Sequence, residues 1–293
     1  MNHQFQNPNS KIQNRKVQNR ESEIEKLEIR LLLEAIFEYY GYDFRDYAEA
    51  SIRRRIWKRI NTERLKSVSG LQERILHDPA CFGRLLRDLT INVTDFFRDP
   101  DFYRAFRQKA VPLLRTYPFV RIWHAGCASG EEVYSMAILL HEEGLYERCH
   151  LYATDIAEQV LEQAGTGIFP LKTMKRFTEN HIKAGGKAPF STYYTAKYNN
   201  AIFKPFLKKK MLFAQHNLAL DSSFNEFNAV ICRNVMIYFN HKLQSRAHRL
   251  FYESLCRKGI LGLGAKESLI GTPHESDYEL LDKENKLYRR GAG

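Results

Sequence analysis

The stretch Val120-Arg-Ile-Trp-His-Ala-Gly-Cys-Ala-Ser-Gly130-Glu131-Glu132-Val-Tyr-Ser135 decides the fold of this chain of 293 residues. The apolar run that ends at Trp123 predicts a buried strand. A loop of small residues with two glycines follows it, and apolar residues then recur at helical spacing from Glu131 to about Gly144. A strand, a glycine loop and a helix form the first half of a nucleotide-binding βαβ unit.

The second half of this unit is His150-Leu-Tyr-Ala-Thr-Asp155, a predicted strand that ends in a carboxylate. In such folds this acid binds the ribose hydroxyls of a nucleoside. Glu131 and Glu132 open the predicted helix, whose N-terminus would otherwise attract anions. Because a diphosphate would meet like charge there, a cationic cofactor such as S-adenosylmethionine (SAM) is favoured over NAD. Two glutamates can also be ordinary first-turn residues, so the loop alone leaves both interpretations open.

Composition limits the class of protein. With 44% hydrophobic and 13% aromatic residues, the chain can bury the core of one large or two modest domains. It has no apolar run that could span a membrane or serve as a signal peptide, so we expect no membrane insertion. Five scattered cysteines without a C-x-x-C pair, and histidines without H-E-x-x-H, predict a cytoplasmic protein without a metal site. The net charge of +11 predicts an acidic partner: nucleic acid, an anionic membrane or a protein surface.

The chain divides into segments of different composition. Residues 1–22 are rich in Asn and Gln, and we expect a disordered tail there. Residues 23–91 predict a small helical domain, and residues 92–99 a polar and aromatic linker. Residues 100–290 predict a doubly wound α/β domain that binds its ligand at the carboxyl ends of its strands. At about residues 170–210 a helix and a small antiparallel sheet are expected to interrupt this domain.

The predicted helix from about Asp46 to Thr62 carries a dense cluster of like charge. Isoleucines at positions 52, 56 and 60 share one face, and we expect the cationic side chains to point outward from the others. Like charges at i, i+4 spacing are mildly destabilising, which favours a binding surface over a merely solvated face. The cluster consists of Arg53, Arg54, Arg55, Lys58 and Arg59.

Five short motifs follow one another along the chain. They are Asn92-x-Thr94-x-Phe96-Phe97-Arg98, Ala128-Ser-Gly130-Glu131-Glu132-x-Tyr134-Ser135, Ala153-Thr-Asp155-Ile156, Asn217-Leu218, and Cys232-Arg233-Asn234-Val-Met-Ile-Tyr238-Phe239. With them the chain resembles, over roughly residues 25–270, the CheR family of chemotaxis-receptor glutamate O-methyltransferases. The resemblance implies an all-helical N-terminal domain and a Rossmann-like SAM-dependent methyltransferase domain with a small inserted antiparallel β-subdomain. It also implies methyl transfer from SAM to glutamate carboxylates of a chemoreceptor's acidic, helical cytoplasmic region, with S-adenosylhomocysteine as product.

The resemblance also implies roles for the motif residues. Arg98 and Tyr238 would position the substrate carboxylate and the transferred methyl group. The cofactor would be surrounded by Asn92, Thr94 and Arg98 from the linker, Glu131 at the methionine ammonium, Asp155 at the ribose, Asn217 and Leu218 at the adenine, and Arg233 and Asn234 beneath it. The cationic cluster from Arg53 to Arg59 would dock the receptor.

The implied chemistry needs little from the protein. A glutamate carboxylate, with a pKa of about 4.3, is ionised at neutral pH and needs no general base. It must be placed within about 3–3.5 Å of the methyl group, so positioning should dominate catalysis. Two alternatives remain: a methyltransferase that acts on RNA, and a catalytically idle module that senses SAM. Net charge supports the first, but Arg-Asn-Val-Met follows Cys232 where an Asn-Pro-Pro-Tyr type of motif would be required. We therefore expect no nucleic-acid partner, and a monomer because no sustained heptad is present.

Overall fold

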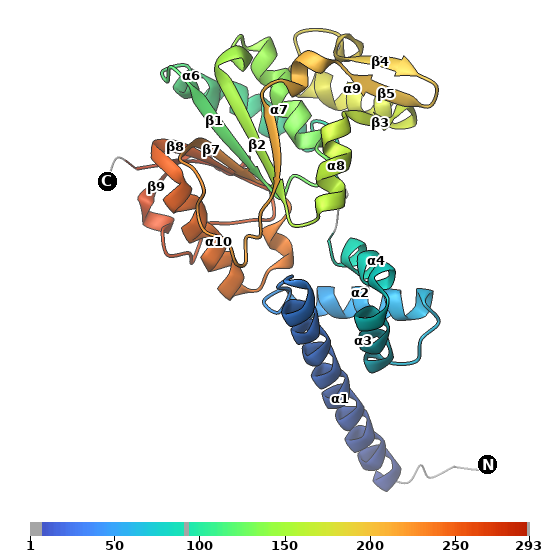
Figure 1. The fold of residues 1–293 in the computed structure, drawn as a ribbon. Helices are drawn as coiled ribbons and strands as arrows, with labels where there is room; N and C mark the ends of the chain where they lie inside the picture. Colours follow the sequence, from blue (N-terminus) through green and yellow to red (C-terminus); the bar gives the residue numbers. More distant parts are fainter. Residues whose placement is uncertain (1–7, 91–93, 292–293) are drawn as a thin grey trace, which may run out of the picture. The chain divides into compact units, whose positions relative to one another are not determined.

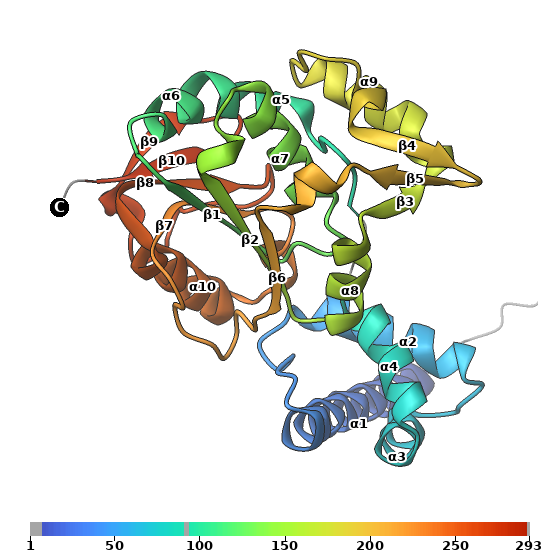
Figure 2. The ribbon, with the colours of Figure 1, turned by 45° about the horizontal axis from the view of Figure 1, so that its top comes forward.

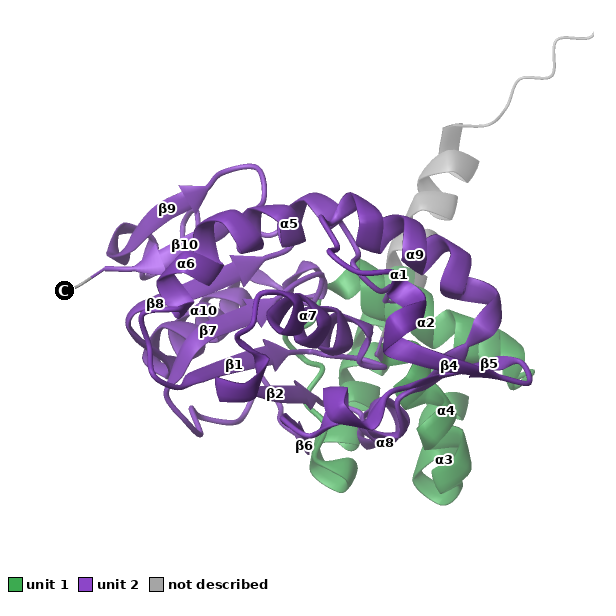
Figure 3. Ribbon diagram, turned by 90° about the horizontal axis from the view of Figure 1, so that it is seen from above, with its two compact units in different colours: residues 1–89 green, residues 90–293 purple. Residues whose placement is uncertain are grey.

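The computed structural model describes residues 8–90 and 94–291, with side chains from residue 22 onward. Figure 3 shows its two compact units, residues 1–89 and residues 90–293. Among the described residues, no helix is both long enough and apolar enough to cross a membrane.

Unit 1 is all helical (Figure 1). It consists of α1 (Pro8–Tyr40), α2 (Glu49–Thr62), α3 (Val68–His77) and α4 (Pro79–Leu89). The helix α1 packs on α3, and α2 packs on α3 and α4. Ile52, Ile56 and Ile60 are fully buried, which confirms the apolar face predicted for α2. The hydroxyl of Ser67 accepts a hydrogen bond of 3.0 Å from the Gly70 amide and caps α3.

The helix α1 begins earlier than the sequence predicted. We expected residues 1–22 to be disordered, but the segment from Pro8 onward is helical. The prediction was therefore wrong for residues 8–22, and residues 1–7 lie outside the described part. Low apolar content was the basis of that expectation, yet lysine, arginine and glutamine have high intrinsic helix propensity.

Unit 2 is built on a sheet of seven strands in the order β6-β2-β1-β7-β8-β10-β9 (Figures 1 and 2). Its parallel strands are β1 (Val120–Ala125), β2 (Cys149–Asp155), β6 (Met211–Gln215), β7 (Phe227–Cys232) and β8 (Leu255–Leu263). The strands β9 (Tyr278–Asp282) and β10 (Leu287–Arg290) complete the sheet with antiparallel pairing. The helices are α5 (Pro100–Ala105), a π-helical turn (Phe106–Ala110), α6 (Val111–Leu114), α7 (Glu131–Glu142), α8 (Glu158–Thr166) and α10 (His241–Ser254).

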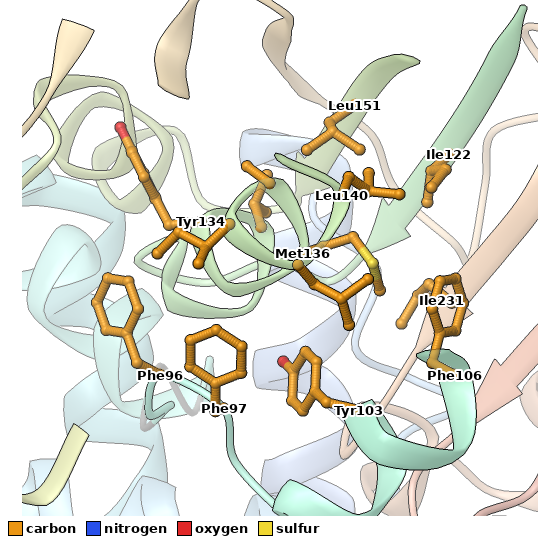
Figure 4. Packing of buried hydrophobic residues seen from close by; sticks show 14 of the residues in the cluster. Phe96, Phe97, Tyr103, Phe106, Ile122, Tyr134, Met136, Leu140, Leu151 and Ile231 are labelled. Carbon is orange, nitrogen blue, oxygen red and sulfur yellow. The ribbon is translucent and has the colours of Figure 1, made fainter. Parts of the chain in front are cut away.

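Helices cover both faces of this sheet. Figure 2 shows α5, α6 and α7 on one face and α10 on the other. The helix α7 is buried almost all round, and Figure 4 shows Met136 and Leu140 packed among strand residues such as Ile122 and Leu151. The strand–loop–helix unit predicted from Val120 to Ser135 is therefore the centre of the core.

A small subdomain is inserted between α8 and β6. It contains β3 (Ile168–Pro170), α9 (Met174–Lys183), β4 (Tyr194–Lys197) and β5 (Asn200–Phe203), with 3-10 turns between them. Its three strands form an antiparallel sheet in the order β3-β5-β4, as expected for residues 170–210. Glu142 at the end of α7 holds the subdomain in place, because its buried carboxylate accepts hydrogen bonds from His181, Tyr193 and the Lys187 amide.

Candidate functional site

The glycine loop connects β1 to α7 and is tied to β2. The amides of Gly126 and Cys127 both donate to the Thr154 carbonyl oxygen, at 2.8 and 2.9 Å. Gly126 has a φ of 78°, and a Cβ atom there would lie 2.5 Å from a methyl group of Val235. The loop therefore requires glycine at this position, both for its backbone conformation and for its contact with the segment that follows β7.

Asp155 ends β2 next to this loop. Its carboxylate accepts hydrogen bonds from the amides of Ala128, at 2.9 Å, and Ala157, at 3.1 Å. Burial raises the pKa of Asp155, and these backbone amides partly offset that effect. The side chain thus braces the loop against β2, at the carboxyl edge of the sheet where the predicted ribose contact would form.

Glu131 is a buried carboxylate that no cation among the described residues contacts. Its side chain accepts a hydrogen bond of 2.7 Å from the Ser129 hydroxyl, and no ion pair joins it within the described part of the chain. The residue is 9% exposed. Burial is the main cause that raises the pKa of Glu131 to about 7, with a smaller contribution from the negative charge of Asp95. A desolvated acid of this kind favours a cationic ligand, such as an ammonium group.

Glu132 has a different environment. Its carboxylate contacts the His124 imidazole at 2.9 Å and accepts a hydrogen bond of 3.1 Å from Arg233. Burial opposes ionisation, but His124 and Arg233 together hold the pKa of Glu132 below its usual value. The Arg233 guanidinium also donates to Asp99 at 2.8 Å and to the Arg98 carbonyl oxygen at 3.0 Å. Glu132 and Arg233 therefore join α7 to the linker, and Glu131 is the glutamate that remains for a ligand.

The linker segment 94–99 is held in an unusual conformation. Phe97 and Asp99 have positive φ values of 50° and 55°. The Phe97 amide donates to the Ser135 hydroxyl at 2.8 Å, and the Phe96 and Phe97 rings are fully buried (Figure 4). These anchors fix the backbone that carries Thr94 and Arg98. Asn92, the third linker residue predicted to contact the cofactor, lies outside the described residues.

Asn217 and Leu218 follow β6. The Asn217 side chain accepts a hydrogen bond of 2.9 Å from the Ala219 backbone amide. The backbone amide of Asn217 donates to the Asp221 carboxylate at 2.8 Å. The Leu218 side chain is buried. Asn217 thus stabilises a turn, and the predicted contact of this pair with adenine stays a prediction.

Glu267 was not recognised from the sequence. Its buried carboxylate accepts four backbone hydrogen bonds, from Gly264 at 2.6 Å, Asn234 at 3.1 Å, Val235 at 2.9 Å and Met236 at 2.8 Å. They pin the loop in which Asn234 has a φ of 61°, just before the 3-10 turn that ends at Tyr238. The available signal was an acid shortly after a parallel strand, the same placement that identified Asp155.

We expect Glu267→Gln to destabilise the protein by about 1–3 kcal/mol, because one oxygen that accepts two amides becomes an amide donor. Urea denaturation measures the effect. Glu253→Gln, on the exposed face of α10, is the matched control. Equal stability of the two variants would contradict the role of Glu267.

The cationic cluster on α2 is smaller than predicted. Arg55 and Arg59 are only 4% and 9% exposed. Arg55 donates to the Leu89 carbonyl oxygen, and Arg59 pairs with Asp88 and Glu63. Both lie three residues after a buried isoleucine, so helical periodicity places them on the docked face. The prediction of an outward position was wrong for these two residues.

The other three cations of the cluster are exposed. Arg53 pairs with Glu25 at 2.7 Å and Lys58 pairs with Asp88 at 2.8 Å, while Arg54 makes no ion pair among the described residues. They line a shallow groove together with Trp57. Residues 23–89 contain 13 Lys and Arg against 12 Asp and Glu, so the charge of α2 is largely compensated within its own unit.

Three features together define a SAM-dependent methyltransferase domain. They are the seven-stranded sheet, the glycine loop, and the two acids beside it, Asp155 at the carboxyl end of β2 and Glu131 at the N-terminus of α7. The family model "CheR methyltransferase, SAM binding domain" matches residues 92–284, and "CheR methyltransferase, all-alpha domain" matches residues 27–90. The chain belongs to the CheR methyltransferase family. This confirms the predicted fold class and SAM as the cofactor.

Curated relatives agree with this assignment. A candidate methyltransferase of Pseudomonas putida, Cher3, is 52% identical over 264 residues, which cover 90% of this chain and 97% of that protein. A chemotaxis protein methyltransferase of Listeria monocytogenes is 28% identical and shares 85% of this chain and 91% of its own length. One of Salmonella typhimurium is 27% identical, with 82% and 83% covered.

Proposed function

We propose that this protein transfers the methyl group of SAM to glutamate side chains of a chemoreceptor's acidic cytoplasmic region. Two relatives that align along most of their length are named chemotaxis protein methyltransferases, which supports a substrate from the chemotaxis machinery, such as a chemoreceptor. The main support for the cofactor site is Glu131 at the start of α7, a buried acid for which the described residues provide no cationic partner. Its carboxylate would hold the ammonium group of the methionine moiety, while Asp155 would bind the ribose.

In the proposed reaction a carboxylate oxygen of the substrate attacks the methyl carbon. The bond between sulfur and methyl breaks, and its electron pair stays on sulfur, so the products are a glutamate methyl ester and S-adenosylhomocysteine. Negative and positive charges neutralise each other in the transition state. A strong fixed cation on the carboxylate would therefore stabilise the reactants more than the transition state.

Arg98 and Tyr238 are the proposed positioning groups. Both are partly exposed, and the backbone of each is fixed: Arg98 through its carbonyl contact with Arg233, Tyr238 through the loop held by Glu267. They would orient the carboxylate and the methyl group without exchanging a proton with either. On unit 1, Arg53, Arg54 and Lys58 remain proposed contacts for the receptor.

A transfer assay with methyl-labelled SAM tests the proposal. Purified receptor cytoplasmic fragment and total RNA are offered separately, and label on the receptor should be released as methanol in alkali, as expected for a methyl ester. Alkali-stable label on RNA would identify the RNA methyltransferase alternative. Binding of S-adenosylhomocysteine without transfer to either would identify the sensing module.

A further inference from the structure

The positive charge of the chain is concentrated in the inserted subdomain. Residues 166–210 contain ten Lys and Arg and one acid, Glu179, which accounts for a net +9 of the chain's +11. Residues 23–89 of the helical unit, by contrast, carry a net charge of only +1. The insert therefore holds most of the excess positive charge of the chain, whereas the charge of α2 is largely compensated within its own unit.

The helix α9 connects this charge to the candidate active site. One side of α9 is buried through Met174, Phe177 and His181. Its flank holds the linker, because Asn180 donates to the Phe96 carbonyl oxygen at 3.0 Å and Arg176 pairs with Asp95. These two contacts lie between Thr94 and Arg98. Thr94 and Arg98 are the linker residues that we propose face the cofactor and the substrate.

The remaining side of α9 faces solvent and has a net positive charge: Lys175 and Lys183 lie on either side of the exposed acid Glu179, and Lys172 lies in the 3-10 turn (Leu171–Thr173) just before the helix. Lys172, Lys175 and Lys183 are exposed, and none of them forms an ion pair or hydrogen bond within the described part of the chain. Helical spacing puts Lys175 and Lys183 on the side of α9 opposite Phe177. We call these two residues, together with Lys172, the α9 lysine face. Ile182 is the exposed apolar side chain beside them, at 67% exposure. A charged surface with so little protruding apolar area suits electrostatic docking of another protein better than insertion into a lipid interface.

We propose that the α9 lysine face docks the acidic segment of the protein substrate and steers it to the adjoining linker. This inference rests on the proposed function, since a segment that presents glutamates for methylation is itself acidic. Docking at an exposed charged rim changes the association rate and its salt dependence more than the chemical step. The α9 lysine face would therefore determine the apparent affinity for substrate and leave the turnover of bound substrate unchanged.

The test is the triple variant Lys172→Glu, Lys175→Glu, Lys183→Glu. The control reverses three exposed cations outside the insert to glutamate: Arg249 on α10, Arg257 on β8 and Lys283 between β9 and β10. Two quantities are measured on the full chain: the Kd for a purified chemoreceptor cytoplasmic fragment and the KM and kcat of methyl transfer to it. We expect Kd and KM to rise about tenfold at low salt in the α9 variant only, with kcat and S-adenosylhomocysteine affinity preserved.

Equal Kd in the α9 variant and the control would overturn the docking proposal. So would wild-type binding to vesicles of anionic phospholipid that the α9 variant loses while its receptor affinity is unchanged. Failure of the proposed function has another signature: wild-type protein would then bind the fragment without forming methyl esters. In that case a selective loss of binding in the α9 variant would still support the docking surface.

Discussion

Glu131→Gln should weaken the binding of S-adenosylhomocysteine about 10- to 100-fold, the usual loss when a charge-assisted hydrogen bond becomes neutral. The glutamine side chain has the same shape, so it preserves the packing around the N-terminus of α7. What it removes is the negative charge that would bind the ammonium group. Isothermal titration calorimetry with S-adenosylhomocysteine measures the change directly.

The affinity should also depend on pH. Because the pKa of Glu131 lies at about 7, the carboxylate is mostly ionised at pH 8 and mostly protonated at pH 6. The cation binds the ionised form, so affinity is complete above the pKa and falls as the pH decreases through it. We expect about a tenfold loss between pH 8 and pH 6, and a flat profile in Glu131→Gln. Glu132→Gln is no substitute control, since Glu132 pairs with Arg233; Glu158→Gln, exposed at the start of α8, is the matched variant. A wild-type affinity independent of pH would contradict the contact.

Glu142→Ala should destabilise the protein by about 3–5 kcal/mol, because it removes one of the two carboxylates that pair with the buried cation of Arg107 and leaves the donors of the insert without their acceptor. The carboxylate side chain is 2% exposed, and its partners come from α9, the following loop and the π-helical turn. Thermal or urea denaturation measures the loss. Glu147→Ala, an exposed acid beyond the same helix, should change stability by less than about 0.5 kcal/mol.

Low pH should reproduce part of this loss of stability in the wild-type protein. Burial opposes ionisation of Glu142, but His181 and Arg107 lower its pKa to about 2 from the usual 4.5. Its contribution is therefore complete above about pH 4.5 and is lost as the pH falls toward 2. The variant should lack that portion of the acid sensitivity, and an unchanged difference between the two proteins from pH 5 to pH 2 would refute the assignment.

The sequence predicted the fold well because its signals were local. The run from Val120 to Ser135 contains a strand, two glycines and a helix within one short segment, and Asp155 follows at the expected strand end. The same reasoning grouped the five cations of α2 by charge alone. Charge alone did not show that Arg59 has a partner in Asp88, 29 residues later, because the pairing of a buried charge depends on contacts distant in sequence. Glu267 was missed for the same reason, since its four amide donors come from two separate loops.

The ring of Phe96 has a consequence for protein engineering. It stacks on Phe203 of the insert, with ring centroids 4.7 Å apart, and also contacts Phe169, Phe177 and Phe190. The linker and the insert therefore share one close-packed core. A chimera that replaces residues 166–210 with the insert of a relative would have to carry a compatible residue at position 96. The insert is thus not an interchangeable module, and a transplant that ignored Phe96 would disturb the backbone that carries Arg98.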